Sequence, residues 1–172
     1  MTQQKHGGQT GTFMLYLDGK DLIGVAECKL PEIKYKTQTV GGSGMLGEVE
    51  FTNPYSLESL EVEIKFNTIT DRTFDLMDMS GKLVEMKAAI IEADGTTQAL
   101  GPTGIRANMR GNAKSLDLGT IKKDDLLNTS FKMEATFLEV FKGDQQLYKV
   151  DKLNGILEAL GKSLLKKLSD LF

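Results

Sequence analysis

A glycine-rich segment in the first third of the chain has the spacing of a nucleotide-binding loop. The residues Gly42-Ser43-Gly44-Met45-Leu46-Gly47 satisfy the pattern G-x-G-x-x-G, in which backbone N–H groups cradle a pyrophosphate. That chemistry needs a strand before the loop and a helix after it, within a βαβ unit. Here Glu48 to Phe51 alternates charged and apolar residues, as a strand does. We interpret the segment as part of a flexible loop and expect no cofactor.

The other side chains that could do chemistry lack suitable neighbours. His6 is the only histidine and lies in a polar segment away from any group of acids or cysteines. Cys28, the only cysteine, ends an apolar strand and is interpreted as a small buried residue. Glu61 and Glu63 are two residues apart on one strand, so they share its solvent face and have no reason to titrate differently. The sequence predicts no catalytic residue and no metal site, so we expect a protein that is not an enzyme.

Composition limits the class of protein. The chain has 172 residues, enough for one domain, with 24 acidic and 21 basic side chains and a net charge of −3. This balance lacks the excess of Lys and Arg that is typical of DNA-binding proteins. The polar start of the chain has no apolar stretch that could be a signal peptide, and apolar runs such as Ala88 to Ile91 are too short to span a membrane. We expect synthesis in the cytoplasm and no membrane partner.

Alternation of apolar and polar residues predicts seven or eight strands. A hairpin is expected around Asp18-Gly19, because Asp-Gly supplies the positive φ angles of a tight turn. Leu60, Val62, Ile64 and Phe66 alternate strictly with charged residues. A further strand is predicted over 83–93, and strands with one buried face are predicted over 105–111 and 130–141, the last with Phe131, Met133, Ala135 and Phe137 on one face. Lys142-Gly143-Asp144 then turns the chain into 146–150.

Two helices and two irregular segments complete the prediction. A short helix is expected over 71–80, capped by Thr70 or Asp71 and ended at Gly81. Leucines at helical spacing predict an amphipathic helix over 153–172. Residues 1–12 are expected to form a mobile arm and residues 40–54 a long Gly-rich loop. The predicted fold is α+β, an antiparallel β-sandwich or barrel-like domain with one short internal helix and a C-terminal amphipathic helix.

Several short motifs, taken in order, resemble one protein family. They are the Asp18-Gly19 hairpin, Leu30-Pro31 before a strand with alternating lysines, the loop from Gly41 to Gly47, Met109-Arg110-Gly111, and the closing hairpin from Phe141 to Asp151 with Asn154-Gly155-Ile156. In this order and spacing the chain resembles the major tail tube proteins of contractile-tailed bacteriophages and of the related R-type bacteriocins. The resemblance spans most of the chain, and the leucine-rich end departs from it.

The resemblance implies a structural role. Members of this family assemble into six-membered rings that stack into a hollow tube inside a sheath, and each subunit adds strands to a β-barrel around the lumen. We therefore expect a virion tail component that is assembled in the bacterial host cytoplasm. Its expected partners are itself, the sheath protein, the tape-measure protein and, transiently, DNA. The loop is similar to the family's long loop that reaches an adjacent ring, so the inter-subunit contact candidates are Gly41, Gly42, Gly44, Met45, Leu46 and Gly47.

A lumen that conducts DNA is expected to be polar and not strongly basic, because tight phosphate binding would hold the DNA. Strand faces of mixed charge fit this requirement, although alternation alone does not say which face points inward. The lumen-lining candidates are Glu61, Glu63, Lys65, Glu85, Lys87, Lys132 and Glu134.

Two other functions are compatible with the sequence. The same architecture serves as the tube of a bacteriocin or a type VI secretion-like injection apparatus, which carries no genome. Alternatively, the chain is a small monomeric β-sandwich that binds a ligand, in which case no rings form.

Overall fold

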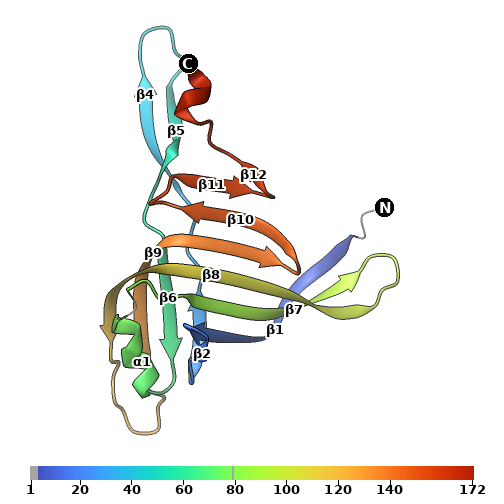
Figure 1. Cartoon of the computed structure of the whole chain (residues 1–172), viewed down its shortest axis with the longest axis vertical. Coiled ribbons are helices and arrows are strands. Elements are labelled where there is room, and N and C mark those ends of the chain that lie inside the picture. The colour runs from blue at the N-terminus through green and yellow to red at the C-terminus, as the bar shows by residue number, and fades with distance from the viewer. Residues whose placement is uncertain (1–3, 79) are drawn as a thin grey trace.

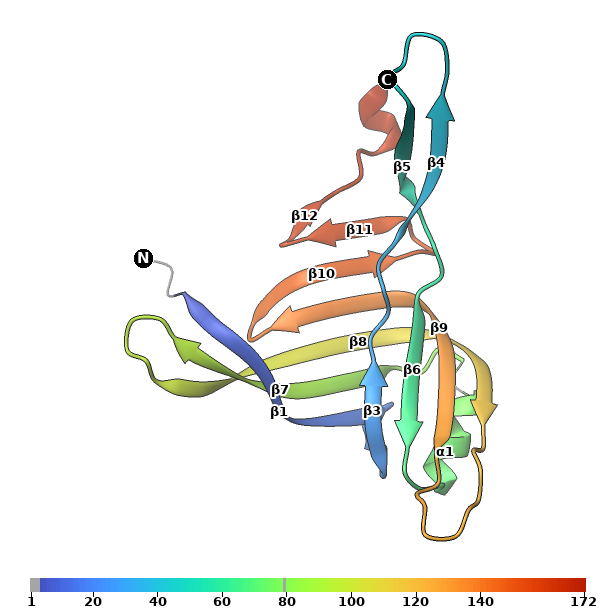
Figure 2. The same ribbon diagram turned by 180° about the vertical axis from the view of Figure 1, so that it is seen from behind.

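Eight antiparallel strands lie in one row and form the main sheet (Figures 1 and 2). The structure is a computed structural model that describes residues 4–78 and 80–172. In spatial order the strands of the row are β12 (Lys162–Ser163), β11 (Ile156–Ala159), β10 (Gln145–Asp151), β9 (Thr129–Lys142), β8 (Leu100–Asp117), β7 (Val84–Asp94), β1 (Lys5–Leu17) and β2 (Lys20–Asp21). This confirms the predicted antiparallel β architecture.

A second layer lies against one face of this sheet. Strand β6 (Glu61–Phe66) pairs with the first half of β9, and β3 (Val25–Lys29) pairs with β6. Both β8 and β9 bend, so each strand runs from the main sheet into the second layer (Figure 2). The register shifts at the bend between Arg110 and Gly111, where β9 contains one extra residue, Thr136.

Glycine is required at this bend. A Cβ atom on Gly111 would lie 1.8 Å from the carbonyl oxygen of Glu134, which is a backbone atom and cannot rotate away. The extra residue in β9 also reverses the alternation of that strand. Phe131, Met133 and Ala135 are fully buried, whereas Phe137 pairs with Arg110 on the opposite face of the sheet. The prediction that Phe137 shares their face is therefore wrong, because the bulge intervenes.

The core fills the space between the two layers. Apolar side chains of β6 and the first half of β9 pack against those of β1, β7 and β8 in one continuous cluster. The strict alternation predicted from Leu60 to Phe66 is confirmed, since the four apolar residues are almost fully buried. Each large side chain buried in this way contributes about 1.5–3 kcal/mol of transfer free energy. The largest fully buried side chains are Phe66, Phe131, Leu15, Leu60, Ile64, Leu76, Met109 and Met133.

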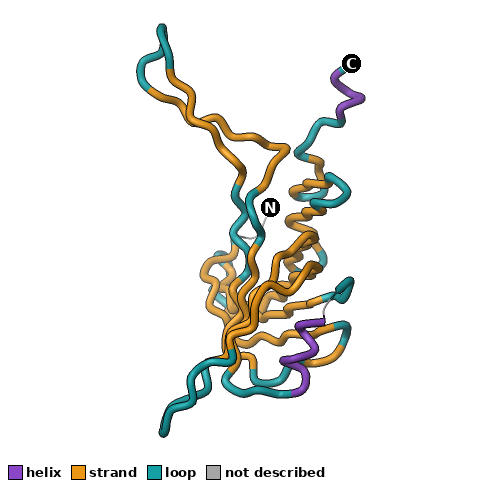
Figure 3. Tube along the Cα trace, turned by 90° about the vertical axis from the view of Figure 1, so that its left-hand side faces the viewer, coloured by secondary structure: helices purple, strands orange, loops and turns teal. Residues whose placement is uncertain are grey.

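Strands β4 (Tyr35–Gly41) and β5 (Glu48–Leu57) form a separate two-stranded sheet. This hairpin extends away from the main sheet at one end of the molecule (Figures 1 and 3). The sequence predicts a long loop over 40–54, but only residues 42–47 form the turn. The glycines and Asn53-Pro54 hid the alternation of the flanking strands, which have both faces exposed over most of their length.

The predicted internal helix is present as α1 (Asp71–Asp75) followed by a 3-10 turn, η1 (Leu76–Asp78). Thr70 is the N-cap, and its N–H donates to Oγ1 of Thr73 at 3.2 Å. Gly81 has φ of 72°, as expected of a residue that follows a helix end. The buried side chains of this segment are Thr73 and Leu76, while Phe74 is half exposed.

The predicted C-terminal helix is wrong. Residues 156–163 form the hairpin β11–β12, and the only helical piece described beyond it is the 3-10 turn η2 (Leu168–Leu171). Leu160 and Gly161 make the hairpin turn, with φ angles of 51° and 75° that an α-helix does not contain. The leucines therefore face in different directions: Leu157 is buried, whereas Leu160 is 61% exposed.

The N-terminal region also differs from the expected arm. Strand β1 begins at Lys5 rather than near Phe13 and pairs with β7 along its length. Two register shifts, near Gly7 and Gly11, accommodate the glycines in the strand. Residues 1–3 of the expected arm lie outside the described residues.

Candidate assembly surfaces

The tip of the β4–β5 hairpin carries all six residues that the sequence predicts as inter-subunit contacts. Met45 N–H donates to the carbonyl oxygen of Gly42 at 3.1 Å, and Gly44 and Gly47 have positive φ angles of 90° and 96°. The glycines thus fold the tip back on itself, and Leu46 projects into solvent with 108% relative exposure. The segment connects two antiparallel strands and opens no helix, so it lacks the context of a dinucleotide site.

Apolar side chains are exposed along the whole hairpin. Phe51 is 57% exposed and Tyr55 is 60% exposed, and Val40, Val49 and Met45 are also open to solvent. The hairpin is fixed to the body at its base, where Tyr35 and Leu57 pack against the core and Tyr55 Oη–H donates to the Lys166 carbonyl at 3.2 Å. Farther out, Thr37 donates to Glu50 across the two strands. Since an isolated two-stranded hairpin is marginally stable in water, this surface is suited to burial against another molecule.

The structure places the seven predicted lumen residues on two separate faces. Glu85 and Lys87 lie on the uncovered face of the main sheet, opposite the buried Val84 and Met86. The other five lie on the outward face of the second layer, on the far side of the core, and are Glu61, Glu63, Lys65, Lys132 and Glu134. The core thus separates the two groups.

The outward face of the second layer is a network of ion pairs. Glu61 binds Lys114 at 2.7 Å and Lys132 at 3.5 Å, and the hydrogen bond from Lys114 is the main reason why the pKa of Glu61 is lowered. For Glu134, burial acts to raise the pKa, but hydrogen bonds from Ser59, from the Leu60 N–H and from Lys152 outweigh it and leave the pKa lowered. The hydrogen bonds thus favour the charged form of both carboxylates, Glu61 and Glu134.

The uncovered face of the main sheet, which we call the open face, includes residues that the sequence analysis did not single out. Cross-strand pairing places Glu85 beside Asn108, Asn108 beside Glu139 and Glu139 beside Lys149. The neighbouring rows add Arg106 beside Lys87, and Arg110 and Asp151 on either side of Phe137. With Glu158, which pairs with Lys149, and Asp21, which pairs with Tyr16 beside Glu85, these rows hold five acidic residues (Asp21, Glu85, Glu139, Asp151, Glu158) and four basic ones (Lys87, Arg106, Arg110, Lys149).

Two cations of the open face, Lys87 and Arg106, contact aromatic rings, and Lys87 also pairs with a carboxylate. The Lys87 ammonium lies 2.6 Å from Glu85 and 4.8 Å from the centre of the Tyr16 ring, and its pKa is raised chiefly by the hydrogen bond to Glu85. The Arg106 guanidinium lies 4.5 Å from the centre of the Phe141 ring. The face is therefore polar, with one more acidic than basic residue in its cross-strand rows, and these two cations already have partners.

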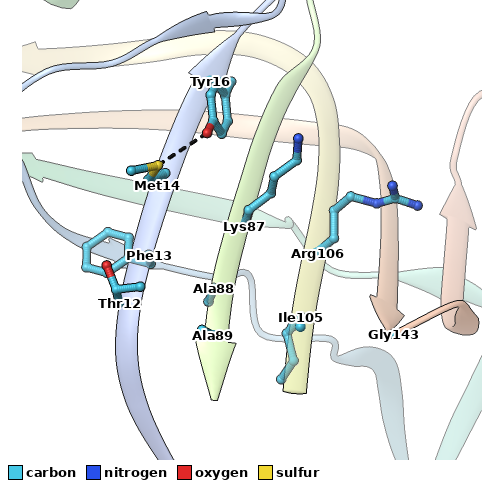
Figure 4. Close-up of a pocket in the computed structure, with 11 residues that line it drawn as sticks. Thr12, Phe13, Met14, Tyr16, Lys87, Ala88, Ala89, Ile105, Arg106 and Gly143 are labelled. Atoms are coloured by element: carbon cyan, nitrogen blue, oxygen red, sulfur yellow. Dashed lines mark hydrogen bonds between the residues drawn. The ribbon is translucent and has the colours of Figure 1, made fainter. Parts of the chain in front are cut away.

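A hollow of about 460 Å³ lies between β1, β7 and β8 at the edge of the open face (Figure 4). Met14, Ala88 and Ala89 contribute apolar surface, and Tyr16 Oη–H donates to the Met14 sulfur at 3.3 Å. Lys87 and Arg106 stand beside it. If the chain were instead a small monomeric β-sandwich that binds a ligand, this hollow would be the binding site to test.

The remaining chemical candidates lie apart from these surfaces. Cys28 faces the core from β3, and burial, with a smaller effect of Glu27, raises the pKa of its thiol to about 12. His6 lies near the start of β1, opposite Ala93. Across residues 4–78 and 80–172, no group of three or more His, Cys, Asp or Glu side chains is placed to hold a metal ion. No described helix is long and apolar enough to cross a membrane.

The solved structures that share this fold include two from contractile systems. One is the tube-terminating cap of the anti-feeding prophage, with a TM-score of 0.53, 8% sequence identity, and coverage of 76% of this chain and 88% of that one. The other is the sheath/tube terminator of an extracellular contractile injection system, PVC, in its extended state, with a TM-score of 0.53, 10% identity, and coverage of 76% and 94%. No curated protein sequence matches the chain.

The sequence itself gives the family. The family model described as phage tail tube protein FII matches residues 11–170, which include the strands of both layers from β3 to β12 and the β4–β5 hairpin. The match spans nearly the whole chain and bears out the resemblance seen in its short motifs. The chain belongs to the phage tail tube protein FII family.

Proposed function

We propose that this protein is the subunit of the inner tube of a contractile phage tail. Six copies form a ring, and rings stack into a conduit through which DNA leaves the virion. The sheath protein surrounds the tube, and the tape-measure protein occupies the lumen during assembly. The protein acts by assembling and catalyses no reaction.

The observation that carries this proposal is the β4–β5 hairpin. It extends from the body as a two-stranded sheet with the exposed apolar residues Val40, Val49 and Phe51 on one face and with exposed apolar residues at its tip, Leu46 above all. Ordering the hairpin costs conformational entropy, and in a monomer this cost is not offset, because the hairpin buries little of its surface against the rest of the chain. A second subunit that covers it supplies the missing burial.

The edges of the main sheet support lateral assembly. Strand β2 pairs only with Tyr16 and Leu17, so most of β1 has no strand beside it on that edge within the described part of the chain. At the other edge, β12 consists of two residues. Unpaired edges are a hazard in a monomer, whereas a ring uses them to join the sheets of neighbouring subunits.

We assign the lumen to the open face. Within the described residues, it is the face of the long sheet that no second layer covers, and its five acidic residues slightly outnumber its four basic ones. A polar wall without an excess of basic residues does not bind phosphates tightly, so DNA slides along it. Of the lumen candidates from the sequence, Glu85 and Lys87 belong to this wall.

Assembly of the purified protein tests the function. We expect rings and tubes in negative-stain electron micrographs and a large, concentration-dependent rise in light scattering. Deletion of residues 41–47 removes the hairpin tip without touching the core, so this variant is expected to keep the Tm of the body but to form no tubes. Ser43→Ala, a change at the same tip that keeps its length and apolar residues, is the control and assembles normally. A wild-type chain that stays monomeric at every concentration contradicts the proposal.

A second candidate function has the same fold but belongs to an injection apparatus that carries no genome. The two similar solved structures are terminators of injection systems, so the same fold serves at the end of a tube as well. A tube subunit stacks on itself without limit, whereas a terminator forms one ring and stops. Multi-ring tubes of the purified chain therefore favour the tube subunit, and capsid and terminase genes beside its gene favour a phage.

A further inference from the structure

The second layer covers only part of the main sheet. Strand β3 is the outer strand of that layer, and among the described residues it pairs with β6 alone. Beyond β3, the covered face of β1, β7 and β8 carries half-buried apolar side chains, which are Phe13, Ala88, Ile90 and Ile105. A groove of about 400 Å³ lies over these residues and is bounded by Ala26 and Cys28 of β3. We call it the β3 groove.

The β3 groove combines an open strand edge with an apolar floor. The free edge of β3 offers N–H and C=O groups to an added strand, and alternate side chains of that strand reach the floor. Farther along the same strands, Leu15, Met86 and Ala107 are almost fully buried in the core between the layers. One more strand or hairpin beside β3 therefore extends the second layer and completes the burial of the floor.

The outer part of the β4–β5 hairpin has the two faces of such a layer. The cross-strand register places Val40, Val49 and Phe51 on one face. The other face is polar and carries Glu48 and Glu50 together with three threonines, which are Thr37, Thr39 and Thr52. Strand β6 divides its residues in the same way, with apolar side chains toward the main sheet and charged ones outward. The hairpin thus resembles a piece of the second layer whose apolar face is still exposed.

The direction of the hairpin brings it to the groove of a neighbouring copy. Strand β4 follows β3 and β5 precedes β6, and the hairpin continues the line of these strands past the β12 edge (Figure 2). The β3 groove lies toward the opposite edge of the main sheet, beside β1, so a chain cannot fill its own groove. When the β12 edge of one copy meets the β1 edge of the next, the hairpin extends over the second copy.

We propose that the β3 groove receives the β4–β5 hairpin of the neighbouring copy in the same ring. The apolar face of the hairpin packs on Phe13, Ile90 and Ile105, and a free edge of the hairpin pairs with β3. Glu48 and Glu50 stay in solvent, as the charged residues of β6 do. Neighbouring subunits are then joined in both layers. This inference rests on the proposed function, since it names the surface on which the hairpin docks within a ring.

Site-specific cross-linking in the full chain tests the docking. The photo-reactive residue benzoylphenylalanine replaces Phe51, and rings are assembled from a mixture of isotopically light and heavy chains. After irradiation, mass spectrometry identifies the joined peptides and shows whether they come from different copies. We expect cross-links between copies, from position 51 to the residues that line the β3 groove. The same group in place of Thr52, on the polar face, is the matched control and is expected to give no cross-link to the groove.

A charge on each face of the hairpin tests the same contact by assembly. Phe51 is 57% exposed in the single chain, so Phe51→Asp is expected to leave its circular dichroism and Tm unchanged. In the docked state the carboxylate faces the apolar floor, so the yield of rings in sedimentation velocity is expected to fall on the order of tenfold. Thr52→Asp adds the same charge to the face that stays in solvent and is expected to keep the yield.

The outcomes separate this inference from the function. If the chain forms tubes but position 51 cross-links outside the β3 groove, or only within one copy, the inference fails and the function stands. The same holds if Phe51→Asp and Thr52→Asp assemble equally well. Cross-links to the groove that occur in tubes but not in isolated single rings place the hairpin between rings and also overturn the inference. If the wild-type chain forms neither rings nor tubes, the proposed function itself fails.

Discussion

Gly111 is the residue on which the bend of the two long strands depends most directly. We predict that Gly111→Ala lowers the free energy of unfolding by about 3 kcal/mol, because the new methyl group overlaps the Glu134 carbonyl and the strands must separate. For a chain of this size, thermal denaturation is expected to show a fall in Tm of roughly 6–12 °C.

A control for this change lies in the same strand. Gly104 also belongs to β8, and a Cβ atom there would meet nothing within 4 Å. Gly104→Ala is therefore expected to change the stability by less than about 0.5 kcal/mol. Equal effects of the two substitutions mean that β8 tolerates a side chain at the bend, contrary to the geometry described above.

For the β11–β12 hairpin, the expected effect of a substitution differs from the effect expected in a helix. Leu160 adopts a positive φ angle, which is unfavourable for a branched apolar residue but readily adopted by Asn. Leu160→Asn is expected to stabilise the protein by about 1 kcal/mol, measured by denaturant unfolding, since Asn-Gly is a preferred two-residue hairpin turn.

Leu157→Asn is the matched substitution, because both leucines belong to the stripe that predicts a helix. Leu157 is buried, so its replacement is expected to cost about 3 kcal/mol. In an amphipathic helix the two changes would have the same sign. If both substitutions destabilise the protein, the result contradicts the hairpin and favours the helix that the leucine spacing predicts.

Elements with one buried face were predictable from the sequence. Strand β6 and the turns at Asp18-Gly19 and Gly143 follow from local rules that the tertiary structure does not override. The C-terminal hairpin was not predictable, because leucines at helical spacing indicate a helix more strongly than the single Leu-Gly dipeptide indicates a turn. The same holds for β9, where the extra residue Thr136 moves Phe137 to the other face, and no pattern in one sequence marks a bulge.

The candidate site was predictable only in part. The hairpin tip was singled out because its Gly-rich sequence is similar to the long loop of the family. The residues of the open face could not be grouped from the sequence, because the grouping depends on which strands are neighbours. Arg106, Glu139 and Lys149 come from three strands whose order is set by the fold. Alternation identified Glu61 and Glu85 as solvent-facing residues, but only the layers show that they lie on opposite sides of the core.

For the whole molecule, the assignment of the lumen predicts which side chains a tube encloses. In a Cys28→Ser background, we expect Lys87→Cys to react with a bulky polymer-linked maleimide in free subunits but not in assembled tubes. Lys132→Cys, on the outward face of the second layer, is the control and is expected to react in both states. Gel shifts measure the labelled fraction. Rapid labelling of Lys87→Cys in intact tubes means that the open face is not the lumen wall.

The bend of β8 and β9 also determines how the subunit carries mechanical load. The two strands run without interruption from the main sheet into the second layer, and they are hydrogen-bonded to each other on both sides of the bend. The layers are thus joined by two covalent backbones as well as by the packing of side chains. A force on the second layer is therefore transmitted to the main sheet along these backbones, and the layers slide past each other only if that ladder of hydrogen bonds is sheared. In the tube that we propose, this connection is expected to make each subunit resist shear between its two layers.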